Sequence, residues 1–238
     1  QKSARIDRES TSCMESNKTL KIWLNLQEVL SSTITKPAPV AGYDSEEEGF
    51  KTKFSETVSQ FDVSHIRCFF DCDEVYPGVY IATKAAVVNM EYLKHLRITH
   101  VLNVAEGAEN SLGFVHFPEG FFKDSAIKYL GIPLDDVPHE NIGDNFRKCA
   151  NFIEEALESG GKVVVSCLMG VSRSPAIIIA YLMLKRSMSA TEATQWVKTK
   201  RDIFPNSGFL RQLAELEIEI SSKDQGDHCS SHPEVHTV

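Results

Sequence analysis

The sequence predicts an α/β fold, a single domain in which helices flank a central, mostly parallel sheet. Over about residues 66–221, short apolar segments of strand length alternate with longer segments whose apolar residues recur at helical spacing. One strand segment, residues 163–166, is apolar on both faces, as expected of a strand buried on both sides of a sheet. The chain has 238 residues, 42% of them hydrophobic and 24% charged, which is enough to bury a core of its own. Together these observations favour a sheet covered by helices over a purely helical or disordered chain.

Residues 1–65 differ from this pattern and are expected to form a partly disordered N-terminal extension. Residues 1–18 are polar and without periodicity, whereas residues 19–30 place apolar side chains on one side, which predicts a short helix. Two interpretations of this helix are open: it docks on the main domain, or it binds a partner. Residues 36–54 contain prolines, glycine and an acidic run, which is typical of a linker.

The elements of the main domain follow in order along the chain. The expected strands are residues 79–82, 100–104, 127–132 and 163–166, and the expected helices are residues 84–96, 144 to the glycines at 160–161, 174–185, 189 to beyond Trp196, and 205–220. Residues 106–124, rich in glycine and phenylalanine, are expected to be an irregular surface loop. Residues 222–238 are polar and predicted to be a disordered tail.

Three sequence signals set the boundaries and faces of these helices. Ala85, Val88, Met90 and Leu93 have the spacing of the buried face of the first helix. Asp144 is expected to cap the next helix, because aspartate accepts hydrogen bonds from free backbone N–H groups at a helix start. Ser189 with Glu192 has the spacing of a capping box.

Charge and composition exclude several classes of protein. With 25 basic and 33 acidic residues, the net charge of −8 argues against nucleic-acid binding, although it leaves room for a small anion site. The longest apolar stretch, Ala176–Leu184, is far shorter than the ~20 residues that span a bilayer, so no membrane association is expected. No secretion signal opens the sequence. The six cysteines lack metal-ligand spacing, so we expect no metal and a reducing compartment, the cytoplasm or also the nucleus.

One cysteine has a neighbourhood typical of a nucleophile. Cys167 follows the buried strand and lies six residues before Arg173, where a helix with Pro175 in its first turn begins. A loop in this position can direct several N–H groups at one point beside the positive helix end, which favours an anion or a thiolate. The planar guanidinium of Arg173 suits two phosphate oxygens. A cysteine is more often an inert core residue, but none of the other five has an arginine at this offset.

With this motif the sequence resembles the cysteine-dependent protein phosphatases, and more narrowly the small atypical dual-specificity phosphatases. The segments that carry the resemblance are Asp73–Tyr80, Ile98–Asn103, Pro133–Pro138, Cys167–Arg173 and Pro205–Leu210, within residues 66–221. The resemblance implies hydrolysis of phosphotyrosine and of phosphoserine or phosphothreonine on proteins, through a cysteinyl-phosphate intermediate and without a cofactor. Mitogen-activated protein kinases are substrates expected only at the level of the family.

The resemblance also implies a role for particular residues. Cys167 would attack phosphorus and Ser174 would steady the departing thiolate, while a carboxylic acid on the loop 134–139 would protonate the leaving oxygen. Asp136 is favoured for that acid over Asp135, since one of the two aspartates can serve only to form the turn. The phosphate oxygens would be held by the guanidinium of Arg173 and by the backbone amides of Leu168, Met169, Gly170, Val171, Ser172 and Arg173.

The sequence departs from the family at Ser166, where the usual residue before the cysteine is histidine. Loss of that histidine should leave the thiolate less stabilised, so we expect an enzyme of weakened activity. The alternative is a pseudophosphatase that binds phosphoproteins without turning them over. A phosphoinositide or RNA-phosphate phosphatase is disfavoured because Leu168, Met169 and Val171 are apolar and the loop has no lysine.

Overall fold

The computed structural model describes residues 2–32 and 71–227, and the predicted linker at 36–54 lies outside them. A five-stranded sheet with the order β1-β2-β5-β3-β4 forms its centre. The strands are β1 Cys72–Tyr76, β2 Val79–Ala82, β3 His100–Asn103, β4 Lys128–Gly131 and β5 Val163–Ser166. β1 is antiparallel to β2 and all the other neighbours are parallel. The predicted α/β class with a mostly parallel sheet is therefore confirmed.

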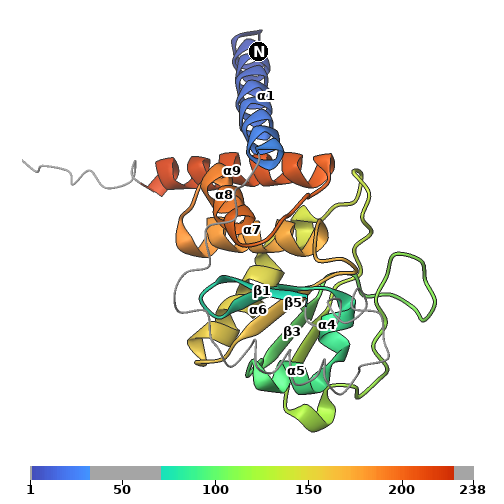
Figure 1. Cartoon of the computed structure of the whole chain (residues 1–238). Helices are drawn as coiled ribbons and strands as arrows, with labels where there is room; N and C mark the ends of the chain where they lie inside the picture. Colours follow the sequence, from blue (N-terminus) through green and yellow to red (C-terminus); the bar gives the residue numbers. More distant parts are fainter. Residues whose placement is uncertain (1, 33–70, 228–238) are drawn as a thin grey trace, which may run out of the picture.

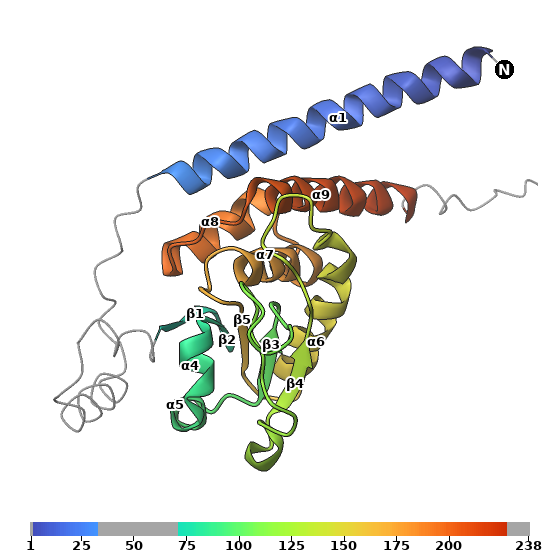
Figure 2. The ribbon, with the colours of Figure 1, turned by 90° about the vertical axis from the view of Figure 1, so that its right-hand side faces the viewer.

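Helices cover the sheet in layers. The helices are α1 Lys2–Ser31, α4 Lys84–Val88, α5 Met90–His95, α6 Phe146–Glu158, α7 Arg173–Arg186, α8 Ala190–Lys200 and α9 Ser207–Asp227, with 3-10 turns at Lys123–Ser125 and Gly143–Asn145. Figure 1 shows α6 on one side of the strands and α4 with α5 on the other. α7 packs against α6 and β5, α8 and α9 pack on α7, and α1 lies outermost against α8 and α9 (Figure 2). No helix of the described ranges is long and apolar enough to cross a membrane.

The central strands and α7 form the core. Every residue of β2, β3 and β5 is buried, as the apolar run Val163–Val165 predicts. In α7 all side chains from Arg173 to Met183 are buried, so this helix is covered on all sides rather than on one stripe. The sequence analysis did not predict β1, because its polar residues Asp73 and Glu74 are typical of an edge strand rather than a core strand.

Two predictions about helix boundaries are wrong. The expected helix 84–96 is broken at Asn89, whose side chain accepts a hydrogen bond from the N–H of Tyr92 and caps α5. The break rotates the buried face: the residues buried there are Ala86, Val87, Tyr92 and Leu93, so of the four expected residues only Leu93 is buried. Asp144 does not cap α6, because it lies in the 3-10 turn before the helix and accepts a hydrogen bond from Asn141 instead. The capping box of Ser189 and Glu192 is present at the start of α8.

Both terminal helices are longer than the sequence pattern indicates. α1 begins at Lys2 rather than near residue 19; no proline or glycine interrupts it, so a helix anchored by packing at its end can continue through polar sequence. α9 continues to Asp227, so the first residues of the predicted tail are helical. α1 docks on the domain: Leu26 and Leu30 are buried, and the Trp23 indole Nε1 donates to the carbonyl oxygen of Ser207 over 3.1 Å.

The register of the parallel strands brings four loops to one edge of the sheet. The last residues of these strands lie side by side, in the order Ala82, Ser166, Asn103 and Gly131. The chain leaves each of them at the carboxyl end, where open α/β sheets place their ligands. The loop that follows Ser166 begins with Cys167, so the fold positions the predicted site at this edge.

Candidate active site

Cys167 lies at the bottom of the loop that joins β5 to α7. Its side chain is 1% exposed, and its sulfur accepts a hydrogen bond from the backbone N–H of Gly170 at 3.2 Å. The hydroxyl of Ser174, in the first turn of α7, lies 3.3 Å from the same sulfur. The sulfur therefore lies beside the start of a helix, where negative charge is favoured. The structure thus brings Cys167, Gly170 and Ser174 together as the sequence predicts.

The backbone of this loop is turned with its carbonyl groups outward. The carbonyl oxygens of residues 168–171 accept hydrogen bonds from the N–H of Lys84, from two nitrogens of Arg201 and from the N–H of Phe204. In a planar trans peptide the carbonyl and the following N–H point in opposite directions. The N–H groups of residues 169–172 therefore point away from those partners, toward the concave side where the sulfur lies. Gly170 allows this turn, because its φ is +66° and an added Cβ would meet the Ala82 carbonyl oxygen at 3.0 Å.

Arg201 fixes this loop from behind, and the sequence analysis missed it. The guanidinium is buried and donates to the carbonyl oxygens of Gly170 at 2.9 Å and Met169 at 3.3 Å. It also pairs with Asp71 and Asp73, at 2.6 Å in each case. Burial acts to lower the pKa of Arg201, but the hydrogen bonds and charges of the two aspartates outweigh it and raise the pKa. Arg201 therefore stays charged while it positions the loop of residues 167–173, which is called the phosphate loop after its expected role.

Arg173 joins the loops that follow β3 and β4 to the phosphate loop. Its Nη1 donates to the carbonyl oxygens of Gly113 at 2.9 Å and Leu134 at 3.1 Å. Its Nε is buried and has no hydrogen-bond partner within residues 2–32 and 71–227, and Oδ2 of Asp136 lies 3.6 Å from it. A buried N–H of a guanidinium without a partner is rare in a native protein and points to a missing acceptor. An oxyanion held over the Cys167 sulfur would supply one.

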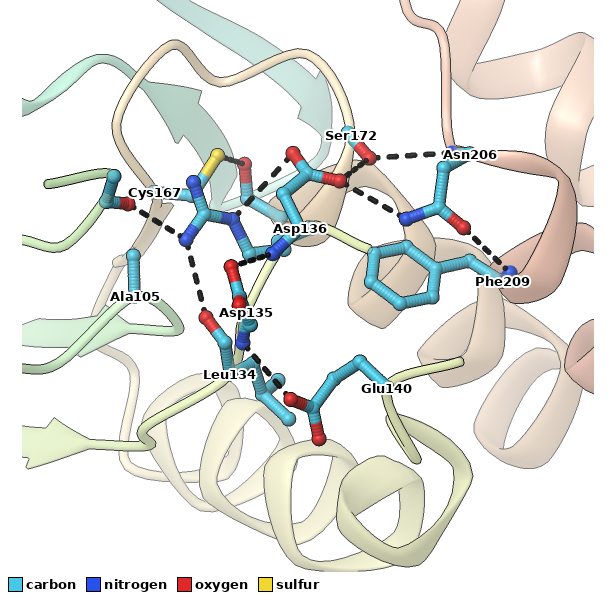
Figure 3. A network of polar contacts seen from close by, with 12 residues as sticks. Ala105, Leu134, Asp135, Asp136, Glu140, Cys167, Ser172, Asn206 and Phe209 are labelled. Carbon is cyan, nitrogen blue, oxygen red and sulfur yellow. Dashed lines mark hydrogen bonds and ion pairs between the residues drawn. The ribbon is translucent and has the colours of Figure 1, made fainter. Parts of the chain in front are cut away.

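The loop of residues 134–139, called the acid loop after its expected role, holds two aspartates with different surroundings. Oδ1 of Asp136 accepts from the hydroxyl of Ser172 at 2.6 Å and from the Asn206 amide Nδ2 at 3.0 Å. Figure 3 shows one carboxyl oxygen of Asp136 facing both Ser172 and Asn206. The Asp135 side chain instead accepts from the backbone N–H of Asp136, at 2.8 Å, as a turn-forming aspartate does. Of the two, the structure brings Asp136 to the phosphate loop, and it adds Asn206, a contact that the sequence analysis did not assign.

Ser166 is buried at the end of β5, next to the proposed nucleophile. Its hydroxyl oxygen has no hydrogen-bond partner within the described part of the chain, although its carbonyl oxygen accepts from the N–H of Val104 at 2.8 Å. The Ser166 side chain therefore adds no hydrogen bond to the Cys167 sulfur. Over the described ranges, no three histidine, cysteine or acidic side chains gather in a way that could hold a metal ion.

A cysteine at the carboxyl end of a central parallel strand, with an arginine six residues later opening the next helix, defines the cysteine-dependent protein phosphatases. The chain has this arrangement, with the arginine buried at the bottom of the same loop. A model of the dual specificity phosphatase catalytic domain matches residues 79–219. The chain belongs to the dual specificity phosphatase family.

Similar proteins are found among both sequences and solved structures. The dual specificity protein phosphatases 26 of Homo sapiens and Pongo abelii are each 40% identical over 149 residues, covering 62% of this chain and 68% of theirs. The crystal structure of human DUSP28 aligns with a TM-score of 0.55 at 28% identity, covering 63% of this chain and 95% of that chain. The human tyrosine phosphatase-like serine/threonine/tyrosine-interacting protein aligns with a TM-score of 0.54 at 30% identity, covering 63% and 97%.

Proposed function

We propose that the chain is a protein phosphatase that hydrolyses phosphotyrosine, phosphoserine and phosphothreonine on proteins. The observation that carries this proposal is the buried Arg173 guanidinium, whose Nε has no hydrogen-bond partner among the described residues, in a loop whose Gly170 N–H also bonds the Cys167 sulfur. A phosphoryl group supplies acceptor oxygens for that nitrogen and for the inward N–H groups of residues 169–172. The catalytic domain comprises about residues 66–221, with an extension at 1–65 and a tail at 222–238.

In the first step the Cys167 thiolate attacks phosphorus in line, forming the S–P bond as the bond to the substrate oxygen breaks. The carboxyl group of Asp136 donates its proton to that departing oxygen, so that tyrosine, serine or threonine leaves as a neutral hydroxyl. Arg173 and the loop amides hold the three equatorial oxygens, where negative charge is concentrated in the transition state.

In the second step water attacks phosphorus and releases inorganic phosphate. The Asp136 carboxylate takes the proton from the water as the P–O bond forms and the S–P bond breaks. The Ser174 hydroxyl, 3.3 Å from the sulfur, donates a hydrogen bond to the thiolate that leaves. The enzyme returns to its starting protonation state after each cycle.

The surroundings of the loop support a phosphoprotein as substrate. Met169 in the loop is 62% exposed and Phe204, whose N–H bonds the Val171 carbonyl oxygen, is 56% exposed. These apolar side chains suit peptide residues beside a single phosphoryl group, whereas a polyphosphate headgroup or RNA would favour lysines. Mitogen-activated protein kinases are candidate substrates by membership of the family alone. The cytoplasm or nucleus is the proposed location, because the buried cysteines Cys149 and Cys167 form no disulfide within the described part of the chain.

We expect this phosphatase to have weakened activity, and the second candidate is a pseudophosphatase that binds phosphoproteins without turning them over. The unpartnered hydroxyl of Ser166 favours it, because the thiolate lacks the support that a histidine at this position normally gives. One similar structure is of a protein named as phosphatase-like and as an interacting protein. In this candidate the same loop would hold a phosphorylated side chain without cleaving it.

The full 238-residue chain assayed on para-nitrophenyl phosphate, beside Cys167→Ser, separates the two candidates. We expect slow turnover by the wild type and none above background by Cys167→Ser, with both proteins binding a phosphotyrosine peptide. Turnover by the wild type that is no faster than that of Cys167→Ser, with peptide binding retained, would establish a binding module instead. Loss of both properties would reject the phosphate site altogether.

A further inference from the structure

We infer that Asn206 is a positioning residue for the general acid: it fixes the Asp136 carboxyl group so that Oδ2 carries the transferred proton. The inference rests on the proposed function and extends it to a residue at the start of α9. Asn206 and Asp136 are 70 residues apart in the sequence, but the structure joins them by a hydrogen bond of 3.0 Å.

Both ends of the Asn206 amide are engaged, which fixes its orientation. Its Oδ1 accepts from the backbone N–H groups of Gly208 at 3.0 Å and Phe209 at 3.1 Å, so it caps α9. The opposite end, Nδ2, is then left to donate to Oδ1 of Asp136 (Figure 3). A flipped amide would place an NH₂ group against two N–H donors, so the orientation follows from the network.

Ser172 closes the arrangement from the phosphate loop. Its hydroxyl donates to Oδ1 of Asp136 at 2.6 Å and accepts from the backbone N–H of Asn206 at 3.2 Å. Each of the three residues thus contacts the other two. The acid, the phosphate loop and the start of α9 are held as one unit.

The rest of the acid loop is fastened to the same helix. An added Cβ at Gly208 would lie 1.8 Å from the carbonyl oxygen of Pro138, so the backbones meet with no room for a side chain. Gln212 donates to the carbonyl oxygen of Glu140 at 2.8 Å and accepts from the N–H of Gly143 at 2.8 Å. The start of α9 is therefore a fixed support against which Asn206 can hold Asp136.

The consequence for the chemistry concerns which oxygen carries the proton. Oδ1 of Asp136 is occupied by two donors, so a proton on that oxygen would meet two N–H or O–H groups. No described residue donates a hydrogen bond to Oδ2, and Nε of Arg173 lies 3.6 Å from it, beyond hydrogen-bond distance. Asn206 thereby acts on protonation of the leaving group, not on attack by the sulfur.

The test is Asn206→Asp, compared with the matched control Asn89→Asp. The aspartate still offers an acceptor to cap α9, but it removes the donor to Asp136. Asn89 caps α5 in the same way through Tyr92, away from the phosphate loop. We measure kcat/KM of the full-length proteins on aryl phosphates whose leaving groups range from phenol to dinitrophenol, and the pH profile of each.

For Asn206→Asp we expect kcat/KM on phenyl phosphate to fall by about 30-fold, the size of a partial loss of general acid catalysis. The loss on dinitrophenyl phosphate should be below about threefold, because that leaving group needs no proton. The alkaline limb of the pH profile should flatten, and Asn89→Asp should match the wild type in all three measurements. Ser172→Ala, which removes the other donor to Oδ1, should show the same dependence on the leaving group and serves if Asn206→Asp does not fold.

Equal losses on every leaving group, or no loss on phenyl phosphate, would overturn the inference while leaving the phosphatase intact. A wild type whose turnover does not depend on Cys167 would overturn the proposed function and this inference with it.

Discussion

Two cysteines are buried in the same core, but their surroundings give their thiols different expected reactivity. Cys149 on α6 is 0% exposed and Cys167 after β5 is 1% exposed. Burial raises the pKa of the Cys149 thiol to about 12, and the charge of Lys148 lowers it only in part. The Cys167 sulfur is equally buried, but it accepts a hydrogen bond from the N–H of Gly170 and lies beside the hydroxyl of Ser174. Burial alone produces an inert thiol, and directed polar groups are what make a buried thiol a candidate nucleophile.

The largest effect that this comparison predicts is in alkylation by iodoacetate at pH 7. With a pKa of about 12 only about one Cys149 thiol in 10⁵ is ionised at that pH, so we expect Cys167 to react faster by at least about a thousandfold. Because ionisation of Cys149 requires loss of a proton, its alkylation should rise about tenfold per pH unit up to its pKa. Mass spectrometry of the labelled peptides measures both rates. Inorganic phosphate should slow alkylation of Cys167 and not of Cys149. Equal labelling rates of the two thiols at pH 7 would contradict the predicted difference in reactivity.

The next effect separates the two aspartates of the acid loop. Asp136→Asn should lower kcat/KM on phenyl phosphate by about 100-fold, because an amide cannot donate a carboxyl proton to the leaving oxygen. Asp135→Asn keeps the acceptor for the Asp136 N–H and should stay within about twofold of the wild type. Steady-state rates for both variants decide the assignment, and a larger loss at Asp135 would reverse it.

A smaller effect on kcat is expected from Arg201, which supports the phosphate loop through its carbonyl oxygens. Arg201→Gln removes the donors to the Gly170 and Met169 carbonyl oxygens and leaves two aspartates unpaired. We expect a loss of about tenfold in kcat and about 2 kcal/mol in the free energy of unfolding. Arg186→Gln is the control, since it breaks the pair with Glu154 and should lower stability without lowering kcat. Denaturant unfolding and kcat measured together would reject the role of Arg201 if both variants behaved alike.

The smallest expected effect is an increase in kcat. Ser166→His introduces the histidine that the resemblance to the family implies before the cysteine, and it should raise kcat by about fivefold by stabilising the thiolate. The double variant Ser166→His with Cys167→Ser should remain inactive, which excludes a new nucleophile. An unchanged or lower rate in the single variant would mean that the buried serine does not weaken the enzyme.

Local features were predictable from the sequence, and contacts between distant segments were not. The strand, the loop and the start of α7 lie within thirteen residues, 163–175, so their pattern is visible in one stretch. Arg201 meets Asp71 across 130 residues and Asn206 meets Asp136 across 70, and no local pattern records such a pair. Asn206 does lie in the segment Pro205–Leu210 that resembles the family, but a resemblance gives no hydrogen-bond partner.

Two wrong boundaries have a common cause. Both Asn89 and Asp144 are residues that can bond to nearby backbone groups, and the sequence alone does not say which one they choose. Asn89 capped a helix where a continuous one was expected, and Asp144 bonded to Asn141 where a cap was expected. Such polar residues shift a boundary by a few positions without altering the order of elements.

The docked α1 helix means that the unit that folds is larger than the unit that the family defines. Lys198 of α8 donates to the carbonyl oxygen of Leu30 at the end of α1, and Trp23 bonds the carbonyl of Ser207, the residue after Asn206. A fragment of residues 79–219 would therefore lack α1, which packs against α8 and α9. Such a fragment would expose apolar side chains of α8 and α9 and lose the Trp23 hydrogen bond beside Asn206. We therefore expect its phosphatase rate to be lower than that of the whole chain.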